Sequence, residues 1–307
     1  MEPIEIKSLD EFVKNICEVK KHNLDELVSK GFLDKFKHLF RGQPNIDYDL
    51  SPSIQRYIAS INDNNEFPWS MERNLVEMAK IRFPNIFTND LQPIELLSLL
   101  QHYGIPTRLL DVTENALVAL YFACKSDFDK DGEVIVFLPE EFNIANSPLA
   151  NGIADSYRFL NNGYCNLNIF YKRIIEQPYF WEQKNVHKKK ENDNNELLGA
   201  EWIKECCKKT FFVNAPFRTL RQQIQCGRYI LFPNSIKDLR IKGAVPYFES
   251  RIDPLPKEHK CIKKRICIPA DKKEQILNDL KMFGISKGIL FGDSVDKVCE
   301  DIKDSFK

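Results

Sequence analysis

The chain has 307 residues, enough for one large domain or for a medium domain with substantial additions. Hydrophobic residues make up 43% and charged residues 29%, which is typical of folded proteins and excludes general disorder. Lysine plus arginine and aspartate plus glutamate both number 44, and this zero net charge disfavours a protein whose whole surface wraps a polyanion.

The N-terminal residues lack the basic start and apolar run of a signal peptide, and no apolar stretch approaches the ~18 residues of a membrane span. Nine cysteines are scattered along the sequence without a C-x-x-C pair or a second half-site at zinc spacing. We therefore expect reduced thiols, no bound metal, no membrane partner and a cytoplasmic location.

The first forty residues are predicted to form helices followed by a strand. Ser8 and Glu11 have the spacing of a capping box and precede apolar residues at helical intervals, and a second short helix is expected at residues 24–28. Residues 36–40 are expected to form a strand that ends at an Arg-Gly pair, followed by a polar loop.

Three helices are expected in the next segment. Ser70 is a candidate N-cap for the first helix, and Pro93 suits the first turn of the second, whose apolar stripe ends at Gly104. Thr113 is the candidate N-cap of the third helix. Residues 105–112 are therefore expected to form a tight loop between two helices.

Most of the remaining strands are expected further along the chain. The apolar, β-branched run at residues 133–138 predicts a buried strand, and further strands are expected at residues 228–232 and 262–268. Residues 184–196 contain almost no apolar side chains and are predicted to be a solvated loop.

The C-terminal segment is expected to be a compact unit. Asp271 and Glu274 have capping-box spacing, which predicts a helix that ends at Gly284, and a strand at residues 285–291 and a final helix follow. Because helices interrupt the strands without a regular βαβ repeat, we expect an α+β fold with a mixed or mostly antiparallel central sheet flanked by helices. We divide the chain into a helical extension at residues 1–30 and one domain at residues 31–307.

Four segments resemble the FRG domain family, which is named for an aromatic-Arg-Gly motif near its start. Residues 40–43 (FRGQ) match that motif, and residues 101–113 (QHYGIPTRLLDVT) closely match the longest signature of the family. Residues 225–229 and 284–291 are similar to two later motifs. The family recurs among bacterial defence and toxin-like genes, so the resemblance implies a bacterial toxin or an antiphage defence effector.

Arg41 stands beside Gly42, where a backbone can approach a ligand closely and a guanidinium can bind phosphate. The motif is similar to the aromatic-Arg-Gly of many ADP-ribosyltransferases, which implies that Arg41, Gly42 and Gln43 contact NAD or a related nucleotide. Gln225 would then replace the catalytic glutamate of those enzymes. The amide of Gln225 cannot carry the negative charge of a glutamate, but it can form a hydrogen bond with a ribose hydroxyl. The alternative for Arg41 is a structural role, bonding carbonyls or an acidic partner.

Three more polar residues fall within the long signature. His102 is predicted in the last turn of its helix, as a general base or ligand donor or, alternatively, as a cap for carbonyls. Arg108 and Asp111 are three residues apart. They form either an internal ion pair that fixes the loop, or a second guanidinium and an acid-base group that face the same cleft as Arg41.

We therefore predict a nucleotide-handling enzyme that resembles an ADP-ribosyltransferase, binds NAD and uses a protein or nucleic acid as acceptor. The alternative is a non-catalytic module that recognises RNA or a partner protein through the same cleft. Such a module would not need the catalytic glutamate that Gln225 replaces. The catalytic candidates are His102, Gln225 and Asp111, and the NAD-binding candidates are Arg41, Gly42, Gln43 and Arg108.

Overall fold

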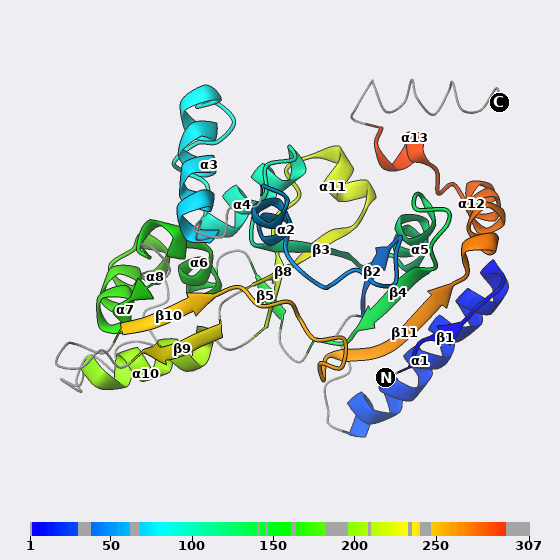
Figure 1. Ribbon diagram of the computed structural model, residues 1–307, viewed down its shortest axis with the longest axis horizontal. Helices are drawn as coiled ribbons and strands as arrows, with labels where there is room; N and C mark the ends of the chain where they lie inside the picture. The colour runs from blue at the N-terminus through cyan, green and yellow to red at the C-terminus, as the bar shows by residue number, and fades with distance from the viewer. Residues whose placement is uncertain are drawn as a thin grey trace.

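The computed structural model describes residues 2–29, 38–61, 68–139, 142–144, 147–160, 164–181, 196–207, 210–232, 235–239 and 247–292. An eight-stranded sheet forms the centre of the molecule, and a three-stranded sheet lies beside it (Figure 1). Helices flank the central sheet, so the predicted α+β class is confirmed. No helix within these residues is long and apolar enough to cross a membrane.

The central sheet is mixed. Its β1–β11 and β5–β7 pairs are parallel, and its other pairs are antiparallel. In spatial order the strands are β1 (Ile4–Glu5), β11 (Ile262–Ile268), β4 (Gly132–Phe137), β2 (Leu39–Gln43), β3 (Leu109–Thr113), β8 (Gly227–Leu231), β7 (Phe211–Asn214) and β5 (Phe142–Ile144). The smaller sheet contains β6 (Tyr164–Cys165), β10 (Tyr247–Arg251) and β9 (Ser235–Leu239), with β10 in the middle.

Two hydrophobic clusters cover the two faces of the sheet, and β4 contributes to both. Val134 and Val136 belong to one cluster, whereas Ile135 and Phe137 belong to the other. Successive side chains of a strand point to opposite faces, so a strand buried on both sides needs a continuous apolar run. This explains why residues 133–138 were correctly predicted as a buried strand.

The first cluster is covered by α1 (Leu9–Ser29), α5 (Ala116–Cys124), α12 (Lys273–Met282) and α13 (Lys287–Leu290). The second lies under α2 (Ser53–Ser60), α3 (Pro68–Arg82), α4 (Pro93–His102), α6 (Pro148–Ala154), α7 (Leu167–Ile175), α8 (Pro178–Trp181) and α10 (Glu196–Cys207). Helix α11 (Leu220–Ile224) contacts both β8 and α13. Short 3-10 turns occupy Asp155–Arg158 and Ala270–Lys272.

The central sheet has a weak seam between β2 and β3. β2 pairs with β4 along its whole length, and β3 pairs in the same way with β8. β2 and β3 pair with each other only at Phe40 and Thr113. The ladder is interrupted beyond that pair, beside Arg41 and Asp111.

The prediction of a loop at residues 105–112 is wrong, because residues 109–113 form the central strand β3. Thr113 ends this strand and does not cap the next helix. Asn115 caps α5 instead, since its side chain accepts hydrogen bonds from the amides of Leu117 and Val118. The short apolar run in this segment is buried in the sheet, which its flanking Gly and Pro residues concealed.

Two predictions near the N-terminus are also wrong. Residues 9–29 form one continuous helix rather than two, and Ser70 lies inside α3, which begins at Pro68. Strand β2 begins at Leu39 and includes the Arg-Gly pair instead of ending before it. Residues 36 and 37 of the predicted strand lie outside the described residues.

At the C-terminus, Asp271 belongs to a 3-10 turn, and α12 has no side-chain cap, so the predicted capping box is wrong. Gly284 follows this helix with a φ of 73°, a left-handed conformation that suits glycine, as predicted. The predicted strand at residues 285–291 is instead the short helix α13. The predicted loop at 184–196, apart from its last residue, and the helix after 292 lie outside the described residues.

Candidate functional site

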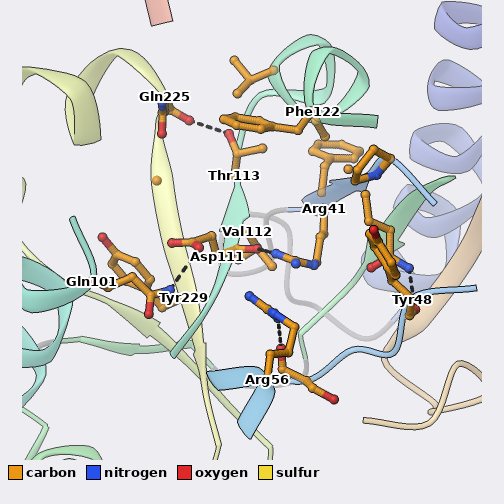
Figure 2. Close-up of a pocket in the computed structure, with 18 of the residues that line it drawn as sticks. Arg41, Tyr48, Arg56, Gln101, Asp111, Val112, Thr113, Phe122, Gln225 and Tyr229 are labelled. Carbon is orange, nitrogen blue, oxygen red and sulfur yellow. Dashed lines mark hydrogen bonds between the residues drawn. The ribbon is translucent and has the colours of Figure 1, made fainter. Parts of the chain in front are cut away.

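A pocket of about 920 Å³ lies at the seam between β2 and β3. Its walls come from β2 and the loop after it, α2, the end of α4, β3, α5, α11 and the start of β8, as Figure 2 shows in part. The pocket therefore unites segments that are far apart in the sequence. Six of the seven predicted site residues line it: Arg41, Gly42, Gln43, His102, Asp111 and Gln225.

Arg41 crosses the seam from β2. Its Nη1 donates a hydrogen bond of 2.7 Å to the main-chain oxygen of Asp111, at a point where the two strands share no ladder bond. Its Nε is buried and has no hydrogen-bond partner within the described residues. Burial lowers the pKa of Arg41 to about 10, although the nearby Asp111 opposes this shift. The guanidinium thus stays charged at neutral pH but is poorly solvated, and an anion would stabilise it.

Arg56 brings a second guanidinium into the pocket from α2. Its Nη1 donates to the main-chain oxygen of Ser51, and Figure 2 shows its head group near that of Arg41. Burial lowers the pKa of Arg56, and Asp111 partly offsets this effect. Arg56 was not predicted from the sequence, because no motif surrounds it. The only signal is a basic residue soon after the FRGQ segment.

Asp111 is held in place on β3 by the end of helix α4. Its Oδ2 accepts a hydrogen bond of 3.0 Å from Nε2 of Gln101. The Oε1 of Gln101 accepts from the hydroxyls of Ser53 and Thr107, at 2.8 and 2.6 Å. Asp111 is the exposed residue of an otherwise buried strand. A fixed carboxylate therefore lies beside two guanidinium groups and remains accessible to a ligand.

Arg108 does not line the pocket, contrary to its predicted NAD-binding role. It is fully buried, and its Nε donates to Glu72 at 2.7 Å. Its two terminal nitrogens donate to the main-chain oxygens of Ile153 and Ala154, at 3.0 and 2.7 Å. The alternative ion pair with Asp111 is also wrong. Arg108 precedes β3 and is buried in the core, whereas Asp111 is the exposed residue of that strand, so the two side chains lie in different surroundings.

Gly42 has a packing role in addition to its place in the pocket wall. A Cβ at this position would lie 1.7 Å from the main-chain oxygen of Ala119. Glycine therefore permits the close contact between β2 and α5. The predicted contact between Gly42 and a ligand stays a prediction.

His102 lies in the last turn of α4, as predicted. Its Nδ1 is 3.3 Å from Oγ1 of Thr219, and the edge of its ring contacts Tyr103 with a centroid distance of 5.0 Å. These contacts orient the imidazole on the pocket wall. They leave its role as a general base a prediction.

Gln225 lies at the C-cap of α11, two residues before strand β8 begins. Its Nε2 donates to the main-chain oxygen of Leu290 at 3.0 Å, and its own main-chain oxygen accepts from Thr113 at 2.6 Å. Figure 2 places Gln225 beyond Thr113, away from Arg56. The nitrogen of its carboxamide thus connects α11 to α13, and its predicted contact with a ribose stays a prediction.

Two further cations line the wall formed by α5 and α11. Nζ of Lys125 lies 4.7 Å from the ring centre of Phe122, and the guanidinium of Arg221 lies 4.4 Å from that of Phe291. The described residues contain no group of three or more His, Cys, Asp or Glu arranged to hold a metal. The wall is therefore basic and aromatic, a combination that suits phosphates and planar rings.

A family model described as the FRG domain matches residues 37–132, about a third of the chain. The matched segment contains β2, β3, α5 and both guanidinium groups at the seam, whereas Arg221 and Gln225 lie outside it. No curated protein and no solved structure matches the chain. Residues 37–132 are therefore similar to the FRG domain, and this similarity includes both strands of the seam.

Proposed function

We propose that the seam pocket binds a nucleotide through its phosphates and that the protein is a nucleotide-handling enzyme. The observation that carries this proposal is Arg41, a half-buried side chain whose Nε is buried and unbonded among the described residues and which lies next to a second guanidinium, Arg56. The two cations outnumber the one carboxylate beside them, that of Asp111. Guanidinium groups bind phosphate oxygens in pairs of parallel hydrogen bonds, and buried cations attract anions most strongly.

NAD or a related dinucleotide is the ligand that we propose. The pocket volume of about 920 Å³ falls in the range of roughly 300–1,000 Å³ typical of small-molecule sites. A diphosphate at Arg41 and Arg56 would leave space on both sides, toward Tyr48 and toward Asp111, which lie on opposite sides of Arg41 in Figure 2. The resemblance of the FRGQ segment to ADP-ribosyltransferases supports the same ligand class.

Asp111 is the residue that we propose for catalysis. Cleavage of a glycosidic bond to nicotinamide develops positive charge on the ribose, and a fixed carboxylate stabilises that charge. Gln225 is neutral and its nitrogen is already bonded, so Asp111 is the better candidate for this role. His102 lines the same pocket and would transfer a proton to or from an acceptor. Such an enzyme would serve as a bacterial toxin or an antiphage defence effector.

Binding is tested by calorimetric titration of the purified chain with ADP-ribose and NAD. We expect Arg41→Gln to weaken binding at least about tenfold, because a charged bond to phosphate is lost. Arg82→Gln is the matched control, since Arg82 is exposed in the last turn of α3 and does not line the pocket. Absence of nucleotide binding, together with RNA retention that Arg41→Gln abolishes, would instead favour the RNA-binding module.

Catalysis is tested separately, by mass spectrometry of nicotinamide released from NAD. We expect Asp111→Asn to slow the release by about a hundredfold or more, while ADP-ribose binding changes little. Nicotinamide release that persists at the wild-type rate in Asp111→Asn would exclude this carboxylate from the reaction.

A further inference from the structure

One end of the pocket contains acceptors but no cations. The lining residues from position 43 to position 55 are neutral or acidic, and the two lysines next to them, Lys257 and Lys273, donate to Glu133 and to main-chain oxygens. Two carboxylates at the rim, those of Asp47 and Asp49, further disfavour a phosphate at this end. A ligand group that enters here would be a hydrogen-bond donor.

Gln43 supplies the first acceptor. It is only 2% exposed, and its Nε2 donates to the main-chain oxygen of Tyr48 at 2.8 Å and to Glu133 at 3.2 Å. Both partners accept hydrogen bonds, so the orientation of the carboxamide is fixed. Its Oε1 therefore points away from Tyr48 and Glu133. This oxygen is buried and has no hydrogen-bond partner in the part of the chain that the structure describes.

Glu133, which holds the carboxamide of Gln43, is itself fixed by two cations. Glu133 is fully buried and also accepts hydrogen bonds from Arg265 at 2.5 Å and from Lys257 at 2.8 Å. Gln43 and Arg41 are two residues apart in β2, so their side chains lie on the same face of the strand. The acceptor of Gln43 and the guanidinium of Arg41 therefore belong to the same wall of the pocket.

Gln55 supplies the second acceptor, one residue before Arg56 in α2. Its Oε1 is likewise buried and has no partner among the residues described. Buried polar atoms are almost always hydrogen-bonded, and an unpaired one destabilises the protein unless a ligand or a water completes it. Two such acceptors among the residues that line the pocket suggest a ligand with N–H donors.

We infer that the end of the pocket formed by Gln43, Tyr48 and Gln55 is a base subsite, selective for a base with an exocyclic amine such as adenine. This inference rests on the proposed binding of phosphates at Arg41 and Arg56. The amide oxygens of Gln43 and Gln55 accept hydrogen bonds from the base, and the ring of Tyr48, whose hydroxyl is held by Asp127 at 2.9 Å, provides an aromatic surface.

The test compares two nucleotides that carry the same phosphates. Purine riboside 5′-diphosphate differs from ADP only by a hydrogen in place of the amine. We expect calorimetry to show that ADP binds at least about tenfold more tightly, because the analogue leaves buried acceptors unpaired. Gln55→Leu should reduce this preference. The matched control is Gln92→Leu, since the Oε1 of Gln92 is also buried and unpaired within the described residues but does not line the pocket.

Tyr48→Leu should weaken both nucleotides by a similar factor, because an aromatic ring contacts either base. Equal affinity of the wild-type protein for the two nucleotides would overturn the base subsite and leave the phosphate site intact. A preference for ADP that persists unchanged in Gln55→Leu would overturn the role of Gln55. Failure of both nucleotides to bind would overturn the base subsite together with the proposed function.

Discussion

Arg41 and Arg108 were both predicted to bind phosphate, yet their surroundings differ. All three side-chain nitrogens of Arg108 donate hydrogen bonds within the core, to Glu72 and to two main-chain oxygens. Arg41 donates one bond to a strand oxygen and has an unpaired Nε within the described residues. A buried cation whose bonds are complete stabilises the fold, whereas one with incomplete bonds is suited to a ligand.

Arg108→Met should have the largest effect on stability. It leaves Glu72 buried without a cation, which costs about 3–5 kcal/mol. Urea unfolding measures the loss. The double variant Glu72→Leu/Arg108→Met should recover much of it, because no unpaired charge then remains. A stable Arg108→Met variant that no longer binds ADP-ribose would contradict the structural role of Arg108.

Gly42→Ala should be the next most destabilising change. Its new Cβ would overlap the main-chain oxygen of Ala119, so β2 and α5 must separate, at a cost of about 3 kcal/mol. Gly227→Ala is the matched control, because Gly227 also lines the pocket and its Cβ would meet its nearest atom at 3.6 Å. Similar unfolding free energies for the two variants would show that Gly42 is not needed for this contact.

The pH dependence of the unfolding free energy tests the surroundings of Asp155, which lies in the core region near Arg108. Burial raises the pKa of Asp155 to about 6, although Arg158 and Tyr179 oppose the shift. Because the folded state binds this proton more tightly, stability should increase as the pH falls from about 7 toward 4, by on the order of 2 kcal/mol from this group. Asp155→Asn should remove that increase. Identical pH profiles of unfolding for the two proteins would contradict the raised pKa.

Arg41→Gln should have the smallest effect on stability. The variant loses one hydrogen bond to Asp111, but it also removes a poorly solvated charge, so the net change should stay within about 1 kcal/mol. Urea unfolding checks this value beside that of Arg108→Met. A loss as large as that of Arg108→Met would show that Arg41 is a structural residue.

The sequence predicted the fold class, several helices and strands, and six residues of the pocket wall. Apolar periodicity and glycine positions carry local information, which is why β4, α4 and Gly284 were predicted correctly. The FRGQ segment and the long signature led to residues on both sides of the seam.

The errors have a common physical origin in contacts between distant segments. Residues 109–113 form a strand only because β8 pairs with them. Arg108 and Asp111 then lie in different surroundings, which sequence spacing did not reveal. Arg56 enters the pocket through the packing of α2, and Glu72 is paired with Arg108 through the packing of α3, so no local pattern identified either residue.

A crystal structure of the protein with ADP-ribose tests the proposed site most directly. We predict that the diphosphate lies at the seam between β2 and β3, within hydrogen-bond distance of the guanidinium groups of Arg41 and Arg56. The proposal would be contradicted if the diphosphate were bound elsewhere and Arg41 kept only its hydrogen bond to the main-chain oxygen of Asp111.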